Sequence, residues 1–491
     1  MTNPEQNEED VKETEIPKTE EGDGGTKLGA WNRLLGCTWK TPLGFLGVAM
    51  TTVSITLIVL GLIGHLSGLI ANHYFAIFTF LFLPAMMMSG LFLIPLSCYL
   101  RRKNWFKNSL MNAENLKIDL GDKHHRKGIV LFLVLSVINV TVLILVAYEG
   151  YHFTDSSYFC GVVCHEVMDP EYTAYQRSPH AKVACVSCHI GPGANWYVQA
   201  KLSGLRQVKA VIDGEFSRPI PAPVKHLRPA RDTCESCHWP DKFHGKRIKE
   251  FVSFTNDNQT VPIVQEVALH IGGRNPVTDD FEGIHWHVSR DIKIEYQALD
   301  EKRTKIGKVK VTRPGGVTEE YAVGDEPAAE EGVELEWRTM DCIDCHNRPT
   351  HVYDNLEQVV DFGLYSKKLN PEIKGIREDS MTVLQKEYTS RDEATEKIVE
   401  DLLELVAKRH GNDFVAQHEK EVVNSGAFLL EAYLNNVWPA MKVTWGTYLQ
   451  HLGHQNADEG YGCFRCHDDE HTTKFGKIIG QDCNMCHDEP N

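Results

Sequence analysis

The sequence predicts three membrane-spanning helices near the N-terminus, followed by a mainly helical and irregular domain that carries a small β insert. Two observations predict this fold class. Residues 41–100 contain no Asp, Glu, Lys or Arg, and a second apolar run follows at 128–148. Beyond residue 149, the chain holds six clusters of two cysteines followed directly by a histidine. Such clusters organise irregular polypeptide around bound groups instead of around one continuous apolar core.

The apolar segments are long enough for three crossings of a bilayer, because each crossing needs roughly 20 apolar residues. We expect these helices near residues 43–71, 74–100 and 128–148, with a turn at Asn72 and His73. Pro84 and Pro95 are expected to kink the second helix, since proline removes a helical hydrogen bond. The first part of the chain therefore predicts a three-helix membrane anchor.

The loop between the second and third helices sets the orientation. Residues 101–127 hold eight Lys and Arg against three acids, and positively charged loops stay in the cytoplasm. The N-terminal tail, with nine acids and three lysines in its first 27 residues, is then a disordered cytoplasmic segment. Residues 149–491 are expected in the periplasm, outside a bacterial inner membrane. Their 38 Lys and Arg against 55 Asp and Glu exclude a nucleic-acid partner.

The spacing of apolar residues divides the remainder of the chain into a β segment and a helical segment. Alternation at Ile292, Ile294 and Tyr296, with a turn at Gly315 and Gly316, predicts a small antiparallel sheet. Residues 355–436 are predicted helical. Ser390 and Glu393 form a capping-box pattern ahead of a helix with Ile398, Leu402, Leu405 and Val406 on one face. The predicted domains are 1–40 (tail), 41–148 (anchor), 149–250 (first three clusters), 251–340 (β insert) and 341–491 (last three clusters).

Five of the cysteine clusters have the spacing CxxCH. This spacing suits covalent attachment of a c-type haem (heme c): two thioether bonds hold the porphyrin, and the adjacent histidine binds the iron. The sixth cluster, CGVVCH, has one additional residue between its cysteines, and we interpret it as a widened haem site. The attachment cysteines are Cys160, Cys164, Cys185, Cys188, Cys234, Cys237, Cys342, Cys345, Cys463, Cys466, Cys483 and Cys486. The attachment histidines are His165, His189, His238, His346, His467 and His487.

Paired cysteines also bind zinc, form disulfides or act as redox pairs. None of these alternatives requires a histidine directly after the second cysteine, so haem is favoured at the five regular motifs. The widened motif is where zinc or a disulfide competes most. Cys37 and Cys98 lie before and inside the apolar region, and we expect them to be buried or interfacial thiols. His65 and His73 are interpreted mainly as polar packing groups, with quinol contact or an intramembrane haem as alternatives.

Six haem irons would each need a second axial ligand, and thirteen histidines beyond residue 149 lie outside the attachment motifs. Two histidine ligands close an iron for electron transfer, whereas an open position would allow substrate chemistry. The number of available histidines favours two protein ligands on each iron. These histidines include His180, His226, His244, His285, His287, His351, His451, His454 and His471. Of these, we predict His285, His451, His454 and His471 as ligands, together with the two histidines that the following resemblance singles out.

The stretches CHEVMDPEYTAYQRSPH, CVSCHIGPGANW and YVQAKLSG resemble the NapC/NirT/NrfH family of membrane-anchored multihaem quinol dehydrogenases. The resemblance covers the first four motifs. It implies Met168 as a ligand at the first haem, and His180 and His351 as distal ligands at neighbouring haems. It further implies that Lys201 lies close to bound quinol. The three-helix anchor and the last two motifs resemble the larger inner-membrane cytochromes of metal-respiring bacteria.

The resemblance implies a quinol dehydrogenase that takes electrons from menaquinol or ubiquinol during anaerobic respiration. Its expected partners are membrane quinol, the lipid bilayer and a soluble periplasmic c-type cytochrome. Two alternatives remain open. A terminal reductase would keep one iron without a second ligand and would reduce a small oxyanion or nitrogen oxide. A docking subunit would only carry electrons to a separate reductase.

Overall fold

The computed structural model describes residues 41–66, 79, 82–102, 121, 123–191, 194–224, 228–239, 243, 245–324, 328–454 and 462–488. The predicted tail 1–40, the turn at 72–73, and His226 and His244 lie outside the described residues, as do the side chains of His65, Cys98 and His165. The chain divides into two compact units, Met1–Thr154 and Asp155–Asn491.

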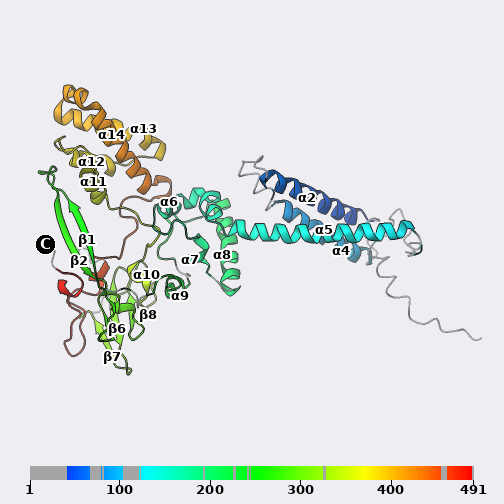
Figure 1. The fold of residues 1–491 in the computed structure, drawn as a ribbon, viewed down its shortest axis with the longest axis horizontal. Helices are drawn as coiled ribbons and strands as arrows, with labels where there is room; N and C mark the ends of the chain where they lie inside the picture. The colour runs from blue at the N-terminus through cyan, green and yellow to red at the C-terminus, as the bar shows by residue number, and fades with distance from the viewer. Residues whose placement is uncertain are drawn as a thin grey trace, which may run out of the picture. The chain divides into compact units, whose positions relative to one another are not determined.

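Within the described residues of the first unit, three α-helices are present: α2 (Pro42–Leu66), α4 (Leu83–Arg102) and α5 (Lys123–Thr154) (Figure 1). Helices α2 and α4 approach closely because small residues face each other; a Cβ on Gly90 would lie 2.7 Å from the Gly47 carbonyl oxygen. Ile58, Leu83 and Met87 are buried with two valines of α5. Small-residue contacts of this kind are typical of membrane helices.

The first unit differs in part from expectation. Among the described residues, one segment, Pro42–Gly61, is long and apolar enough to cross a membrane, and Leu83–Ser97 is a shorter apolar helix. Pro95 lies inside α4, as predicted. Pro84 lies in the first turn of α4, two residues after the π-helical Phe82, and a proline beside a π-helical residue is a recognised place for a helix to bend. Helix α5 extends beyond both ends of the predicted 128–148.

The second unit begins with helices that carry parts of the first three motifs. These are the π-helix η3 (Phe159–Val163), α6 (His165–Gln176), α7 (Cys185–His189) and α9 (Ala230–Cys234). The longer helix α8 (Ala194–Asp213) lies between α7 and α9 and contains no motif residue. The later motifs lie on α10 (Cys342–Cys345) and on the 3-10 turns η8 (Gly462–Arg465) and η9 (Cys483–Met485). A further 3-10 turn, η6 (Pro439–Met441), follows the last long helix.

The predicted β segment forms antiparallel sheets. Strands β5 (Lys293–Ala298), β6 (Ile306–Thr312), β7 (Thr318–Ala322) and β8 (Arg338–Thr339) pair in the order β7-β6-β5-β8. Strands β1 (Lys246–Ser253) and β2 (Ile263–His270) form a hairpin, and the two-residue strands β3 (Gly273–Arg274) and β4 (Phe281–Glu282) pair beside the 3-10 turn η5 (Ile284–Val288). Gly315 and Gly316 connect β6 to β7 with φ of +84° and +81°, as glycine readily allows.

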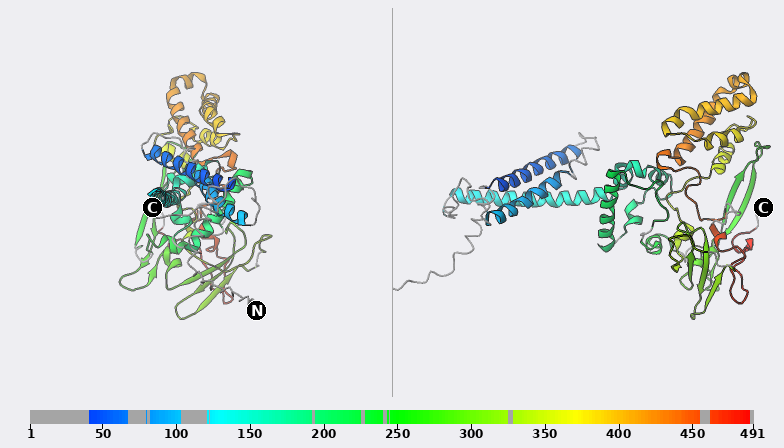
Figure 2. Two further views of the ribbon diagram at one scale, coloured as in Figure 1. Left: turned by 90° about the vertical axis from the view of Figure 1, so that its right-hand side faces the viewer. Right: turned by 180° about the vertical axis from the view of Figure 1, so that it is seen from behind.

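Four helices without an attachment motif pack side by side: α11 (Leu356–Tyr365), α12 (Ile376–Gln385), α13 (Arg391–His410) and α14 (Asn412–Asn436) (Figure 2). Ile398, Leu402 and Val406 are fully buried, as the period predicts, while Leu405 is half-buried. Ser390 caps α13 by accepting a hydrogen bond from the Glu393 N–H. The Glu393 carboxylate accepts a hydrogen bond from the N–H of Thr389, whereas the capping-box pattern predicts the N–H of Ser390 as the donor.

Candidate haem-binding sites

The spacing of a CxxCH motif matches one helical turn. The N–H of the motif histidine donates to the carbonyl of the first cysteine in His238, His346, His467 and His487, with N···O distances of 2.8 to 3.1 Å. This i to i+4 bond holds two thiols and an imidazole close together on one short helix, so that all three can bind one haem. Residues Cys185–His189 form such a turn as α7.

The widened motif folds as a π-helix. Its four residues from Cys160 to Val163 lie within η3, whose wider turn accommodates one residue more than an α-helical turn. Gly161 is buried here, and a Cβ at this position would lie 2.1 Å from the ring of Tyr172 on α6. The additional residue is thus absorbed by the backbone, with η3 packed directly against α6.

Five attachment histidines face a second histidine across a gap that fits an iron. Metal–imidazole bonds are about 2 Å long, and the ring centre lies about 1 Å behind the nitrogen, so two imidazoles on one iron have centroids roughly 6 Å apart. The pairs are His189–His351 (6.2 Å), His238–His180 (6.0 Å), His346–His285 (6.5 Å), His467–His287 (5.8 Å) and His487–His454 (6.2 Å). These residues therefore fit haem c at five positions.

Backbone carbonyls set the tautomer of most of these rings. A carbonyl accepts from Nδ1 of His180, His285, His287, His351, His467 and His487, at 2.8 to 3.3 Å. A proton held on Nδ1 leaves the lone pair on Nε2, which is the nitrogen that binds iron. Burial also lowers the pKa of His189, His285, His287, His346 and His351, so these rings are neutral and able to ligate at neutral pH.

The remaining predicted ligands are placed differently. Met168 is half-buried on α6, and the side chain of its partner His165 is not described. Among the described residues, neither His451 nor His471 faces an attachment histidine. Both are buried, with Nδ1 of His451 and Nε2 of His471 lacking a hydrogen-bond partner there. His287, which the sequence offered only as one of a surplus, lies opposite His467 instead.

Successive motifs are neighbours in space. Thiols from consecutive motifs share a hydrogen bond or lie close enough to interact electrostatically. These neighbours are Cys160 with Cys185, Cys188 with Cys237, Cys234 with Cys342, Cys345 with Cys463, and Cys463 with Cys486. The spatial order of the motifs is therefore their order along the chain.

Glu171 of α6 supports one distal histidine, and sequence reasoning missed it. Its backbone carbonyl lies 3.0 Å and its carboxylate 3.1 Å from Nδ1 of His351. The same carboxylate accepts two 2.9 Å hydrogen bonds from Arg348, whose Nε donates to the His351 carbonyl. All three side chains are largely buried. The segment that carries the first motif thereby orients a ligand of the second.

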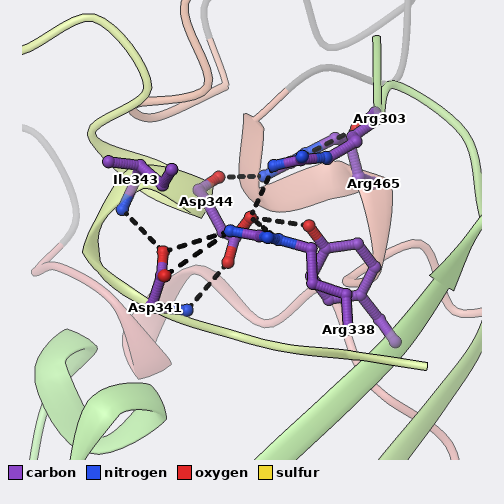
Figure 3. Close-up of polar contacts among 7 residues, drawn as sticks. Arg303, Arg338, Asp341, Ile343, Asp344 and Arg465 are labelled. Atoms are coloured by element: carbon purple, nitrogen blue, oxygen red, sulfur yellow. Dashed lines mark hydrogen bonds and ion pairs between the residues drawn. The ribbon is translucent and has the colours of Figure 1, made fainter. Parts of the chain in front are cut away.

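A buried polar junction connects the fourth and fifth motifs (Figure 3). Asp344 lies between the cysteines of CIDC, with 1% of its side chain exposed, and accepts hydrogen bonds from Tyr296 at 2.6 Å and Arg338 at 3.1 Å. Arg465, between the cysteines of CFRC, donates to the Asp344 carbonyl at 2.6 Å and to the Arg303 carbonyl at 2.8 Å. The spacer residues of two motifs are therefore bonded to each other.

Lys201, the predicted quinol residue, lies beside the first motif. Its ammonium group is 2.5 Å from Oδ1 of Asp155, a carboxylate that the sequence did not single out. The hydrogen bond with Cys185 raises the pKa of Cys160, and Lys201 is near enough to oppose that shift. A half-buried ion pair therefore adjoins the widened motif.

Comparison with known proteins agrees with these sites. Residues 122–219 match the N-terminal region of the NapC/NirT cytochrome c family. The chain is also 38% identical over 457 residues to the cytochrome c-type protein ImcH of Geobacter sulfurreducens, covering 92% of this chain and 88% of that protein. The chain belongs to the NapC/NirT cytochrome c family. A NapC/NirT cytochrome carries covalently bound haem c and is associated with a membrane. No solved structure matches the chain.

Proposed function

We propose that this NapC/NirT cytochrome oxidises menaquinol or ubiquinol at the periplasmic surface of a bacterial inner membrane and delivers the electrons to a soluble periplasmic c-type cytochrome. The observation that carries the proposal is the spatial succession of six motifs, with paired imidazoles at five of them. Haem c supplies reversible one-electron transfer, so motifs arranged in this order suit conduction along the chain.

The residues proposed to hold six haems are the twelve attachment cysteines and six attachment histidines. The distal ligands are His351, His180, His285, His287 and His454 for the second to sixth haems, in that order. Met168 is the proposed ligand at the first. With two protein ligands on each iron, no position would remain for a substrate oxygen, which favours electron transfer over a terminal reductase.

The Lys201–Asp155 pair is the proposed quinol site. Oxidation of a quinol to a quinone releases two electrons and two protons. The ammonium group of Lys201 would hydrogen-bond a quinol oxygen, and the Asp155 carboxylate would accept a proton from the hydroxyl. The adjacent first motif would receive the electrons. The basic loop at 101–127 supports a cytoplasmic N-terminus and proton release on the periplasmic side.

Quinol-driven haem reduction tests this proposal. Full-length protein in liposomes is mixed with a reduced menaquinone analogue, and haem absorbance is followed by stopped flow. We expect Lys201→Ala and Asp155→Asn each to slow reduction on the order of 100-fold, as losses of a proton-transfer group do. Lys397→Ala, on the exposed face of α13, is the control.

Unchanged kinetics in both site variants would refute the quinol site. If the purified protein alone reduces added c-type cytochrome with quinol as the electron donor, a subunit that only docks a separate reductase is excluded. High-spin haem in the resting spectrum, with reduction of a nitrogen oxide or oxyanion, would favour the terminal reductase instead.

A further inference from the structure

Helix α8 presents an apolar stripe to the surface. Leu205, Val208 and Ile212 are spaced three and four residues apart, so they lie on one side of the helix. The exposed fraction is 68% for Leu205, 45% for Val208 and 78% for Ile212. Leu202 beside them is 60% exposed. Water-facing helix surfaces in soluble domains are normally polar, so a continuous stripe of this kind marks a surface that another apolar phase covers.

The charges on α8 indicate what that phase is. The helix holds Lys201, Arg206 and Lys209 against one acid, Asp213, with which Lys209 is ion-paired at the exposed surface, whereas residues 149–491 as a whole are strongly acidic. Lysine and arginine flanking an apolar stripe are the pattern of a helix that lies in a membrane interface, with its basic groups among anionic headgroups. An anionic lipid surface therefore complements α8, although it would repel most of the domain.

Helix α8 contacts the residue at which the chain enters the second unit. Its Lys201 is ion-paired with Asp155, and Asp155 is joined by one peptide bond to Thr154, the last residue of α5. Helix α5 contains the apolar run 128–148. The ion pair thus holds the side chain of Lys201, the residue directly before Leu202, against the residue that follows α5.

We infer that α8 is an interfacial helix, which rests on the bilayer with Leu205, Val208 and Ile212 inserted among acyl chains and with Arg206 and Lys209 at anionic phosphates. The inference rests on the proposed function in that it uses the same membrane surface. It goes further by making α8 a second attachment, independent of the spanning helices. The quinol residue Lys201 is then held at the depth where quinol headgroups lie.

Photolabelling from within the bilayer tests the inference. Full-length protein is reconstituted in phosphatidylglycerol liposomes that contain a phospholipid with a diazirine in its acyl chain, illuminated, and mapped by peptide mass spectrometry. We expect adducts on residues 202–212, with α2 as the positive control. Val277 and Phe475, which are 90% and 87% exposed, serve as apolar controls away from α8 and should remain unlabelled.

Two variants sharpen the test. Leu205→Asn combined with Ile212→Asn should lower the α8 adducts about tenfold while α2 labelling is retained. Arg206→Glu combined with Lys209→Glu should lower them in phosphatidylglycerol and not in phosphatidylcholine, because only the anionic surface repels the new charges.

Three outcomes overturn the inference: α8 unlabelled while α2 is labelled; α8 unlabelled and protected from hydrogen exchange, which means that protein or porphyrin covers it; or equal labelling of Val277 and Phe475. Labelling does not depend on turnover. Normal α8 adducts in protein that fails to oxidise quinol would refute the proposed function alone.

Discussion

A histidine ligand has two ring nitrogens, and the second one determines how well the first binds iron. In this protein, backbone carbonyls occupy Nδ1 of six paired rings, which leaves the lone pair of Nε2 available to iron. His351 differs from the others because its Nδ1 also lies 3.1 Å from the Glu171 carboxylate. A carboxylate gives the imidazole partial negative charge, which stabilises ferric over ferrous iron.

Replacing Glu171 with Gln should therefore raise the reduction potential of one haem. We expect a rise of roughly 50 mV, equivalent to about 1 kcal/mol for one electron, because the variant removes a buried negative charge next to His351 and leaves Arg348 uncompensated. Spectroelectrochemical titration measures the shift. Glu357→Gln, on the exposed start of α11, is the control, and six unchanged potentials in Glu171→Gln would contradict the prediction.

His454 and His451 lie three residues apart, and only His454 faces an attachment histidine. Replacing His454 with Met should convert one iron to His/Met coordination, which raises its potential and adds the red absorption band of a methionine–ferric bond. His451→Met should leave the haem spectrum unchanged, although it alters a buried site. A methionine–iron band in His451→Met stronger than that of the unaltered protein, or no such increase in His454→Met, would show that the pairing is wrong.

At the scale of the element, the inserted residue of the first motif becomes a π-turn, and Gly161 is what allows that turn to pack on α6. Gly161→Ala places a methyl group against the Tyr172 ring, so we expect a loss of about 1 to 3 kcal/mol and under-loading of the first haem. Intact mass and thermal unfolding report the two effects.

The matched control is Gly204→Ala on α8, where a Cβ meets no atom within 4 Å. That variant should be neutral or more stable by roughly 0.5 to 1 kcal/mol, because alanine favours helix. Equal behaviour of the two alanine variants would mean that the contact with Tyr172 does not constrain the motif.

The elements that sequence reasoning found are those with a local signal. The cap at Ser390 and the turn at Gly315 and Gly316 depend on residues a few positions apart, and the structure has both. The pairing of His287 with His467 joins segments 180 residues apart, so no spacing rule predicts it. The same holds for Glu171, whose importance follows only from its contact with Arg348 and His351.

At the scale of the molecule, the number of bound haems tests the widened motif directly. Intact-mass measurement of purified protein should show six covalent haem additions, and Cys160→Ser combined with Cys164→Ser should show five. Five additions in the unaltered protein would leave the η3 site empty and remove the cofactor closest to Lys201, against the proposed quinol oxidation.

The neighbouring thiols of Cys234 and Cys342, and of Cys345 and Cys463, bracket the two long motif-free stretches of the chain. The first stretch folds as strands β1 to β8 and the second contains helices α11 to α14. Each stretch therefore begins and ends at neighbouring motifs. The path of an electron depends on the distance between adjacent cofactors and not on the number of residues between their motifs, so evolution can enlarge or replace either stretch without lengthening that path.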